Sequence, residues 1–184
     1  GLLNAEVKKC VAEHGLWYPP DPSSYEICSI GGNIATNAGG LCCVKYGVTT
    51  DYVLGLEVVL ADGRAVRLGG RTIKDVAGYD LKRLFVGSEG TLGVITEITL
   101  RIYPQPEAVS AASCSFPTVE DAVQTTIATI QMGIPVARCE LLDALTVKAV
   151  NARDKLGLPE MPLLLFEFHG SAASVAEQAT TVEE

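Results

Sequence analysis

The first half of the chain alternates apolar and polar positions in two places. Residues 53–60 alternate with period two, residues 61–64 contain an Asp-Gly turn, and residues 65–68 return as a partner strand. Residues 94–102 alternate in the same way. This pattern predicts an antiparallel hairpin followed by a further strand.

Helical spacing of apolar residues occurs before this hairpin and again after it. One helix is predicted to end at Gly15 and to carry Leu3, Val7, Cys10, Val11 and His14. We interpret His14 as a helix-end residue and not as a ligand. A short helix after the hairpin is predicted to carry Leu81, Leu84 and Phe85.

The second half of the chain alternates strands with helices. Strands are predicted at residues 109–116, 135–142 and 163–169, and a helix at residues 144–155. Another helix has Thr118 as its N-cap and ends at Gly133, and Ser171 caps a final helix. The apolar stripe of the helix after Thr118 is predicted to be Val119, Ala122, Val123, Ile127 and Ile130. The order β-α-β-α-β-α predicts an α+β, ferredoxin-like layer without its closing strand.

The composition narrows the class of protein. The 184 residues are 48% hydrophobic and 20% charged, which is typical of a globular chain. No apolar run approaches the ~20 residues that span a bilayer, and the start lacks the basic region of a secretory signal. The net charge of −8 argues against a nucleic-acid partner, which would require a basic face.

The six cysteines show no Cys-x-x-Cys spacing, and the adjacent Cys42 and Cys43 are poorly placed to bridge each other. We therefore expect free, mostly buried thiols in a reducing compartment, which favours a cytoplasmic or organelle-matrix location.

Glycines gather in two places. Residues 29–40, SIGGNIATNAGG, contain four glycines and two asparagines, and three prolines hold residues 16–24 extended before them. Because glycine lets a ligand approach the backbone closely, we predict a ligand-facing loop there, although such stretches are also common in plain turns. Residues 87–93, GSEGTLG, lead into a strand, whereas a Rossmann fingerprint must open a helix. The sequence contains no P-loop motif.

Four segments together resemble one family. Residues 19–24 (PPDPSS), 29–40, 74–81 (KDVAGYDL) and 87–93 are similar to the FAD-linked oxidases of the vanillyl-alcohol oxidase type, in the group of the glycolate oxidase FAD subunit and D-lactate dehydrogenase. The resemblance implies the central part of a PCMH-type FAD-binding domain at residues 1–106. It implies the first part of a ferredoxin-like substrate-capping domain at residues 107–184. The family's N-terminal lobe and the end of its cap have no counterpart here, so a central fragment is expected.

The resemblance implies FAD as the cofactor. The residues that it places at the cofactor are Pro20, Asp21, Ser24, Ser29, Gly31, Gly32, Asn33, Thr36, Asn37, Gly39, Glu89, Gly90, Gly93, Val94 and Ile95. Because these motifs hold few cations, backbone N–H groups are expected to balance the pyrophosphate charge. Asn33 and Asn37 are expected to meet the polar edge of the flavin. Glu89 either grips backbone amides or a ribose hydroxyl, or orients its own loop, and Lys74 and Tyr79 are candidates to line the site.

The implied reaction is FAD-dependent oxidation of a D-2-hydroxy acid (glycolate, D-lactate or D-2-hydroxyglutarate) by hydride transfer to flavin N5. The implied electron acceptor is a quinone, a cytochrome, an electron-transfer protein or oxygen, and a homodimer is compatible with the family. Two other hypotheses stay open: an enzyme of the same fold that acts on an alcohol or alditol, and a non-catalytic fragment. No catalytic base can be named from the sequence.

Three polar residues of the second half are candidates for a further site. Glu167 and His169 share one strand face but are too few for a metal site, so we predict local hydrogen bonds and no metal. Arg138 either meets a substrate carboxylate or pairs with a neighbouring acidic residue, and the salt bridge is the favoured interpretation.

Overall fold

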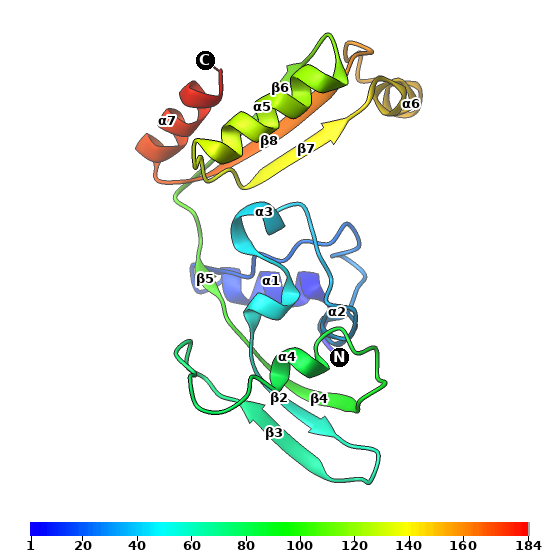
Figure 1. Cartoon of the computed structure of the whole chain (residues 1–184), viewed down its shortest axis with the longest axis vertical. Coiled ribbons are helices and arrows are strands. Elements are labelled where there is room, and N and C mark those ends of the chain that lie inside the picture. Colours follow the sequence, from blue (N-terminus) through cyan, green and yellow to red (C-terminus); the bar gives the residue numbers. More distant parts are fainter. Residues whose placement is uncertain (184) are drawn as a thin grey trace. The chain divides into compact units, whose positions relative to one another are not determined.

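The computed structural model describes residues 1–183, which divide into two compact units (Figure 1). Unit 1 is Gly1–Gln105, and unit 2 begins at Pro106. The elements of unit 1 are α1 (Asn4–Ala12), β1 (Leu16–Trp17), α2 (Ile30–Thr36), α3 (Cys43–Tyr46), the 3-10 helix η1 (Thr49–Tyr52), β2 (Val53–Val59), β3 (Ala65–Gly69), α4 (Lys82–Phe85), β4 (Val94–Leu100) and β5 (Tyr103–Pro104). The predicted helix before Gly15, the hairpin, the short helix and the following strand are confirmed.

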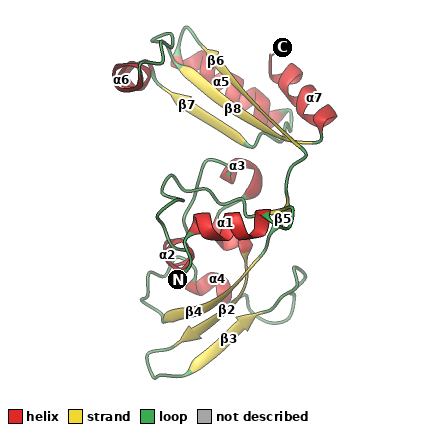
Figure 2. Cartoon of the chain, turned by 180° about the vertical axis from the view of Figure 1, so that it is seen from behind, coloured by secondary structure: helices red, strands yellow, loops and turns green. Residues whose placement is uncertain are grey.

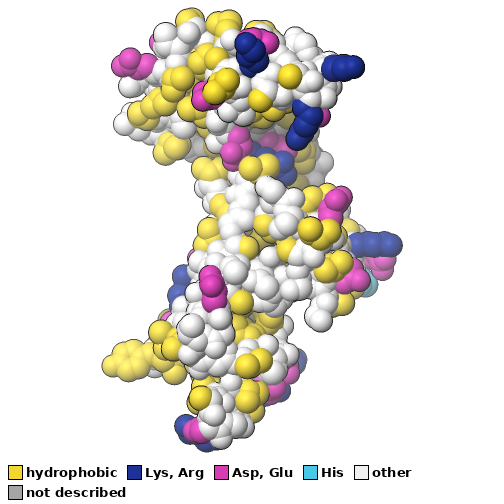
Figure 3. Space-filling view, turned by 90° about the vertical axis from the view of Figure 1, so that its right-hand side faces the viewer, with side chains coloured by type: hydrophobic (Ala, Val, Ile, Leu, Met, Phe, Trp, Pro, Cys, Tyr) yellow, Lys and Arg dark blue, Asp and Glu magenta, His cyan; other side chains and the backbone are white. Residues whose placement is uncertain are grey.

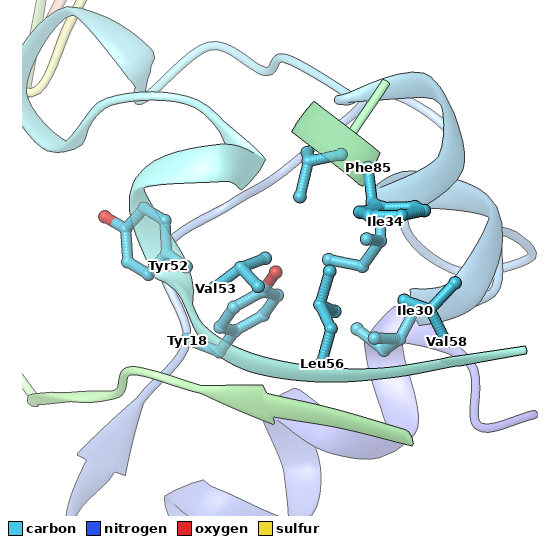
Figure 4. Close-up of a cluster of buried hydrophobic side chains, with 9 residues drawn as sticks. Tyr18, Ile30, Ile34, Tyr52, Val53, Leu56, Val58 and Phe85 are labelled. Carbon is cyan, nitrogen blue, oxygen red and sulfur yellow. The ribbon is translucent and has the colours of Figure 1, made fainter. Parts of the chain in front are cut away.

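The main sheet of unit 1 has the antiparallel order β3-β2-β4, and β1 pairs separately with β5. Leu56 and Val58 of β2 are buried, and they pack in one cluster with Ile30 and Ile34 of α2 and with Phe85 (Figure 4). Ile30 and Ile34 are one helical turn apart, so both side chains leave α2 on the same face. This pair holds α2 against the sheet.

Unit 2 has its own sheet and core. Its elements are β6 (Ala108–Ser115), α5 (Val119–Gln131), β7 (Arg138–Leu142), α6 (Ala144–Asp154), β8 (Leu163–Gly170) and α7 (Ala172–Glu183). The sheet order is β6-β8-β7 with both pairings antiparallel (Figure 2), and the predicted β-α-β-α-β-α order is confirmed. Leu164, Phe166 and Phe168 of β8 pack with Ala122 of α5 and Val175 of α7. Both helices therefore cover the same face of the sheet.

The predicted apolar stripe of α5 is wrong. Ala122 is fully buried, but Val119, Val123, Ile127 and Ile130 are all exposed, whereas Thr129 is buried. The bulky side chains of β8 fill the space beneath α5, so the helix presents its smaller residues to them. The threonine hydroxyls of that face donate to carbonyls one turn earlier, as in the 2.8 Å bond from Thr129 to Thr125. Their methyl groups are left to face the core.

The helix N-caps of unit 2 agree with the sequence prediction at Thr118, whose Oγ1 accepts the N–H of Asp121 at 3.1 Å. Asp143 caps α6 in the same way, with Oδ1 accepting the N–H of Thr146 at 2.7 Å. This bonding to Thr146 lowers the pKa of the Asp143 carboxyl.

The Asp143 cap predicts an acid-sensitive α6. A carboxyl whose folded pKa is lowered stabilises fully above its unfolded pKa, near about 3.9, and loses that contribution as the pH falls through the lower folded value. We expect α6 to loosen below about pH 4. Asp143→Asn, which keeps the capping oxygen without a titrating group, is expected to abolish this step. Residue-resolved NMR between pH 2 and 6 measures it, and identical α6 profiles for both proteins would contradict the assignment.

The six cysteines are free, but the prediction that most are buried is wrong. Cys42 is buried, Cys10 is exposed and the other four are half-buried. Among the described residues, no helix has both the length and the apolar character that crossing a membrane requires.

Candidate functional site

The glycine-rich segment at residues 29–40 is built around a helix, so the predicted loop is wrong over α2. Ser29 is its N-cap, and its Oγ accepts the N–H of Gly32 at 3.0 Å. The helix ends at Thr36, and its C-cap Asn37 has the left-handed φ of 51°. The cap and the two buried isoleucines outweigh the weak helix propensity of the glycines.

Gly31 has no reason inside the chain to be glycine. It lies in a helix without a positive φ, and a Cβ built on it would find no atom within 4 Å. Gly32 differs, because its Cβ would crowd the capping Ser29 Oγ at 3.1 Å. Glycine inside a helix costs roughly 0.5–1 kcal/mol relative to alanine. Both residues are exposed, so α2 presents bare backbone to whatever lies outside it.

The two asparagines of the segment have different surroundings. Asn33 is 4% exposed, and its Nδ2 has no hydrogen-bond partner within the described part of the chain. Asn37 instead uses Oδ1 to accept the N–H of Thr50 at 2.9 Å. This bond gives Asn37 a structural role at the end of α2, whether or not it also contacts the cofactor.

Asn37→Ala is expected to lower the free energy of unfolding by about 2 kcal/mol, roughly half from the left-handed backbone and half from the lost hydrogen bond. Asn37→Gly removes the bond but tolerates the backbone, so it should cost about 1 kcal/mol. Urea unfolding of both variants measures the difference. Equal losses would show that the backbone conformation contributes nothing.

The second glycine motif joins α2 through its main chain. The N–H of Gly87 donates to the carbonyl of Ile34 at 2.9 Å, and the N–H of Glu89 donates to that of Ala35 at 3.0 Å. Glu89 and Gly90 are exposed and have positive φ values of 50° and 80°. The structure therefore brings the two predicted motifs side by side.

The end of this motif packs closely against the sheet of unit 1. A Cβ on Gly93 would lie 2.7 Å from a methyl group of Val58, so glycine is required there by the sheet. Ile95 packs against the core of unit 1, whereas Val94 is 64% exposed. Of these three predicted site residues, only Val94 has a side chain open to the surface.

The proline segment (residues 16–24) contacts the C-terminal end of the glycine-rich segment. Pro20 is buried, and Asp21 Oδ1 accepts the N–H of Cys42 at 3.0 Å. A Cβ on Gly40 would lie 2.5 Å from Asp21, so the two segments touch. Gly39 and Thr36 are exposed nearby on the same segment, and Ser24 is exposed in the turn that follows Asp21.

Sequence reasoning missed three residues of this assembly. Asn4 is fully buried and donates from Nδ2 to the carbonyl of Pro20 at 3.3 Å. Gly40 is required at the contact with Asp21, and Ser88 Oγ is buried without a hydrogen-bond partner among the described residues. Gly40 and Ser88 stood within the recognised motifs. Asn4 could have been found as a polar residue inside a short amphipathic helix.

Two basic side chains near the motifs of unit 1 pair with acids. Arg83 pairs with Asp51 at 3.2 Å, and Lys82 with Asp80 at 2.7 Å. On the face seen in Figure 3, positive side chains stand as separate spots and form no continuous patch. Burial raises the pKa of the Tyr18 and Tyr52 phenols well above the usual range, so neither can act as a base near neutral pH.

The polar residues of the unit 2 sheet bond to one another. Arg138 Nε lies 3.3 Å and His169 Nε2 lies 2.6 Å from the same oxygen, Glu167 Oε1. The predicted salt bridge and the predicted local hydrogen bonding are confirmed. No group of three or more potential metal ligands occurs among residues 1–183.

Known proteins match both units. Residues 1–69 match the FAD binding domain family, and residues 105–184 match the family described as FAD linked oxidases, C-terminal domain. Both parts of the chain thus match domains of FAD-dependent oxidases. The resemblance, the α+β fold class and FAD as the cofactor are thereby confirmed, and the contacts of individual site residues stay predictions.

Three named FAD-linked oxidase relatives share over two fifths of their aligned residues with the chain. Identity is 45% over 185 residues with the glycolate oxidase subunit GlcD of Bacillus subtilis (strain 168), covering 100% of the chain and 39% of that protein. It is 46% over 184 residues with D-lactate dehydrogenase (cytochrome), mitochondrial, of Arabidopsis thaliana, covering 100% and 32%. It is 41% over 189 residues with D-2-hydroxyglutarate dehydrogenase, mitochondrial, of Rattus norvegicus, covering 100% and 35%.

Solved structures show the same fold. Two crystal forms of alkyldihydroxyacetonephosphate synthase superpose with TM-scores of 0.78 and 0.80 at 24% and 25% identity. Each covers 99% of the chain, and the chain covers 37% and 36% of theirs. The chain thus spans well under half the length of the FAD-linked oxidases that it matches.

Proposed function

We propose that the chain is part of an FAD-dependent enzyme that oxidises a D-2-hydroxy acid such as glycolate, D-lactate or D-2-hydroxyglutarate. In this proposal unit 1 is the FAD-binding part and unit 2 belongs to the substrate cap. Relatives named for each of these three substrates support the choice of substrate class. The chemistry that the cofactor supplies is acceptance of a hydride.

One observation supports the assignment of α2 and the loop at residues 87–90 as the surface that contacts the cofactor, which we call the cofactor wall. Gly31 weakens α2 without an internal cause, and the loop at residues 87–90 lies against the same helix. The glycines of α2 and of that loop leave bare main chain that a cofactor can approach closely. Asn33, with an unpartnered buried amide, fits a polar group that approaches from outside the chain.

In this proposal the residues of unit 1 bind and orient the cofactor. The raised pKa of Tyr18 and of Tyr52 disfavours these two phenols as bases. The proposal includes an electron acceptor (a quinone, a cytochrome or an electron-transfer protein), a cytoplasmic or organelle-matrix location, and a homodimer. The name of the Arabidopsis relative, D-lactate dehydrogenase (cytochrome), mitochondrial, supports the electron acceptor and the organelle location.

The test begins with flavin binding. The purified chain is mixed with FAD, freed of unbound flavin by gel filtration and examined for the flavin absorbance near about 450 nm. In the longest form of the protein that can be expressed, we expect the flavin absorbance to be retained. When oxygen is excluded, D-lactate or glycolate should bleach it. Bleaching by an alcohol or alditol instead would identify the other substrate class. Failure of both forms to retain flavin would refute the proposal.

A further inference from the structure

The proline segment has few main-chain donors of its own, because Pro19, Pro20 and Pro22 carry no N–H group. Tyr18, Pro19 and Pro20 are buried. A buried carbonyl that finds no hydrogen-bond partner destabilises the fold. The carbonyls of residues 18–20 therefore require donors from another element.

Two side chains of α1 supply these donors. Asn4 and Lys8 are one helical turn apart, so they leave α1 on the same side. Lys8 Nζ donates to the carbonyl of Tyr18 at 2.5 Å and to that of Pro19 at 3.4 Å. Asn4 Nδ2 donates to the carbonyl of Pro20 at 3.3 Å. Three consecutive carbonyls are thus bound by one side of α1.

The first turn of α1 binds the far end of the same loop. The first N–H groups of a helix have no partner inside the helix. The N–H of Asn4 donates to the carbonyl of Cys28 at 2.9 Å. The N–H of Ala5 donates to the carbonyl of Tyr25 at 3.1 Å. α1 therefore holds both ends of residues 18–28.

The side chain of Asn4 is unfavourable in any role other than this one. It is fully buried, and its Oδ1 has no hydrogen-bond partner among residues 1–183. A buried polar atom that stays unpaired destabilises the fold, so an apolar residue would serve packing alone better. The bond to the Pro20 carbonyl therefore accounts for an asparagine at this position.

We propose that α1 is the positioning helix of the cofactor site, and that Asn4 and Lys8 are its positioning residues. Val7 and Val11 pack against the buried cluster of unit 1, which fixes the helix. Asn4 and Lys8 then set the path of residues 18–28 from this fixed helix. The inference rests on the proposed FAD site, to which the sequence assigns three residues of that stretch.

The position of this stretch is passed to the glycine-rich segment through Asp21. Asp21 Oδ1 accepts the N–H of Cys42 at 3.0 Å, and a Cβ on Gly40 would lie 2.5 Å from Asp21. A shift of residues 18–28 would break the first contact and alter the second. Exchange of the Cys42 amide therefore reports the position of the stretch in the absence of FAD.

Lys8→Met tests the proposal, because methionine keeps an apolar stem but donates no hydrogen bond. We expect FAD to bind at least about tenfold more weakly to the longest form of the protein that can be expressed. We also expect the Cys42 amide to exchange at least about tenfold faster, and to accelerate more than the amides of β2. Flavin fluorescence titration and NMR hydrogen exchange measure the two effects. Lys9→Met, at an exposed position of the same helix, is the matched control and should change neither.

Asn4→Leu is a second variant that keeps a side chain of similar size. It removes the unpaired Oδ1 together with the bond to Pro20, so the urea midpoint should change little while FAD binding weakens. Unaltered FAD affinity in Lys8→Met and Asn4→Leu would overturn the proposal. So would equal acceleration of the Cys42 and β2 amides, which would indicate a general loss of stability. If no form of the protein retained flavin, the proposed function would fail, and exchange at Cys42 would still decide whether α1 positions residues 18–28.

Discussion

Gly31→Ala is expected to weaken FAD binding by at least about tenfold, because its methyl group would stand on the bare backbone of α2 that we assign to the cofactor. The same change should raise the free energy of unfolding of the FAD-free chain by roughly 0.5–1 kcal/mol, because alanine is the better helix former. The opposite signs of the two effects distinguish a binding role from a structural one. Flavin fluorescence titration and urea unfolding measure them.

Cys10→Ala is the matched control for Gly31→Ala. Cys10 is exposed on α1 of the same unit, so alanine there should also stabilise a helix and leave FAD affinity unchanged. If Gly31→Ala bound FAD as tightly as the unaltered chain, the glycine face of α2 would not be the cofactor wall. A fall in stability would reveal an internal packing role for Gly31.

Gly40→Ala is expected to lower the free energy of unfolding by about 3 kcal/mol, in the range for overpacked sites, and to abolish FAD binding. The new Cβ would lie 2.5 Å from the backbone and from the carboxylate oxygen of Asp21. Relief of that clash must move the proline segment away from the glycine-rich segment. It must also strain the hydrogen bond from Cys42 to Asp21.

Gly39→Ala provides the comparison at the neighbouring position. Its Cβ would meet nothing nearer than Cys43 Sγ at 3.9 Å, an ordinary contact. We therefore expect a change in unfolding free energy within about 0.5 kcal/mol, as for surface substitutions. Chemical unfolding followed by circular dichroism separates the two variants. A Gly40→Ala chain as stable as Gly39→Ala would mean that the two segments do not depend on each other.

The sequence predicted the order and type of most elements, because hydrophobic periodicity is local information. It predicted a loop at residues 29–40, because the four glycines of this segment disfavour a helix. The deciding facts are tertiary: Ile30 and Ile34 are buried against β2, and Ser29 closes the first turn. Propensity alone could not weigh a cap and two distant contacts against the glycines.

The misassigned face of α5 has a related cause. Periodicity identifies a stripe of Val119, Val123, Ile127 and Ile130, but it cannot tell what faces the helix from the neighbouring strand. Phe166 and Phe168 of β8 leave room only for alanine and for threonines whose hydroxyls are satisfied within the helix. Likewise, the different roles of Asn33 and Asn37 could not be predicted. The side chain of Asn37 accepts a hydrogen bond from Thr50, which is distant in sequence but adjacent in space.

The junction between the two glycine motifs consists of main-chain hydrogen bonds, from Gly87 to Ile34 and from Glu89 to Ala35. Such a junction does not depend on the identity of the side chains that flank it. It depends on the number of residues between Gly87 and Glu89, because a single insertion or deletion there would move one N–H out of hydrogen-bonding distance of its carbonyl. Related chains can therefore vary in residue type along this junction over evolutionary time, while the spacing between Gly87 and Glu89 should hardly change in length.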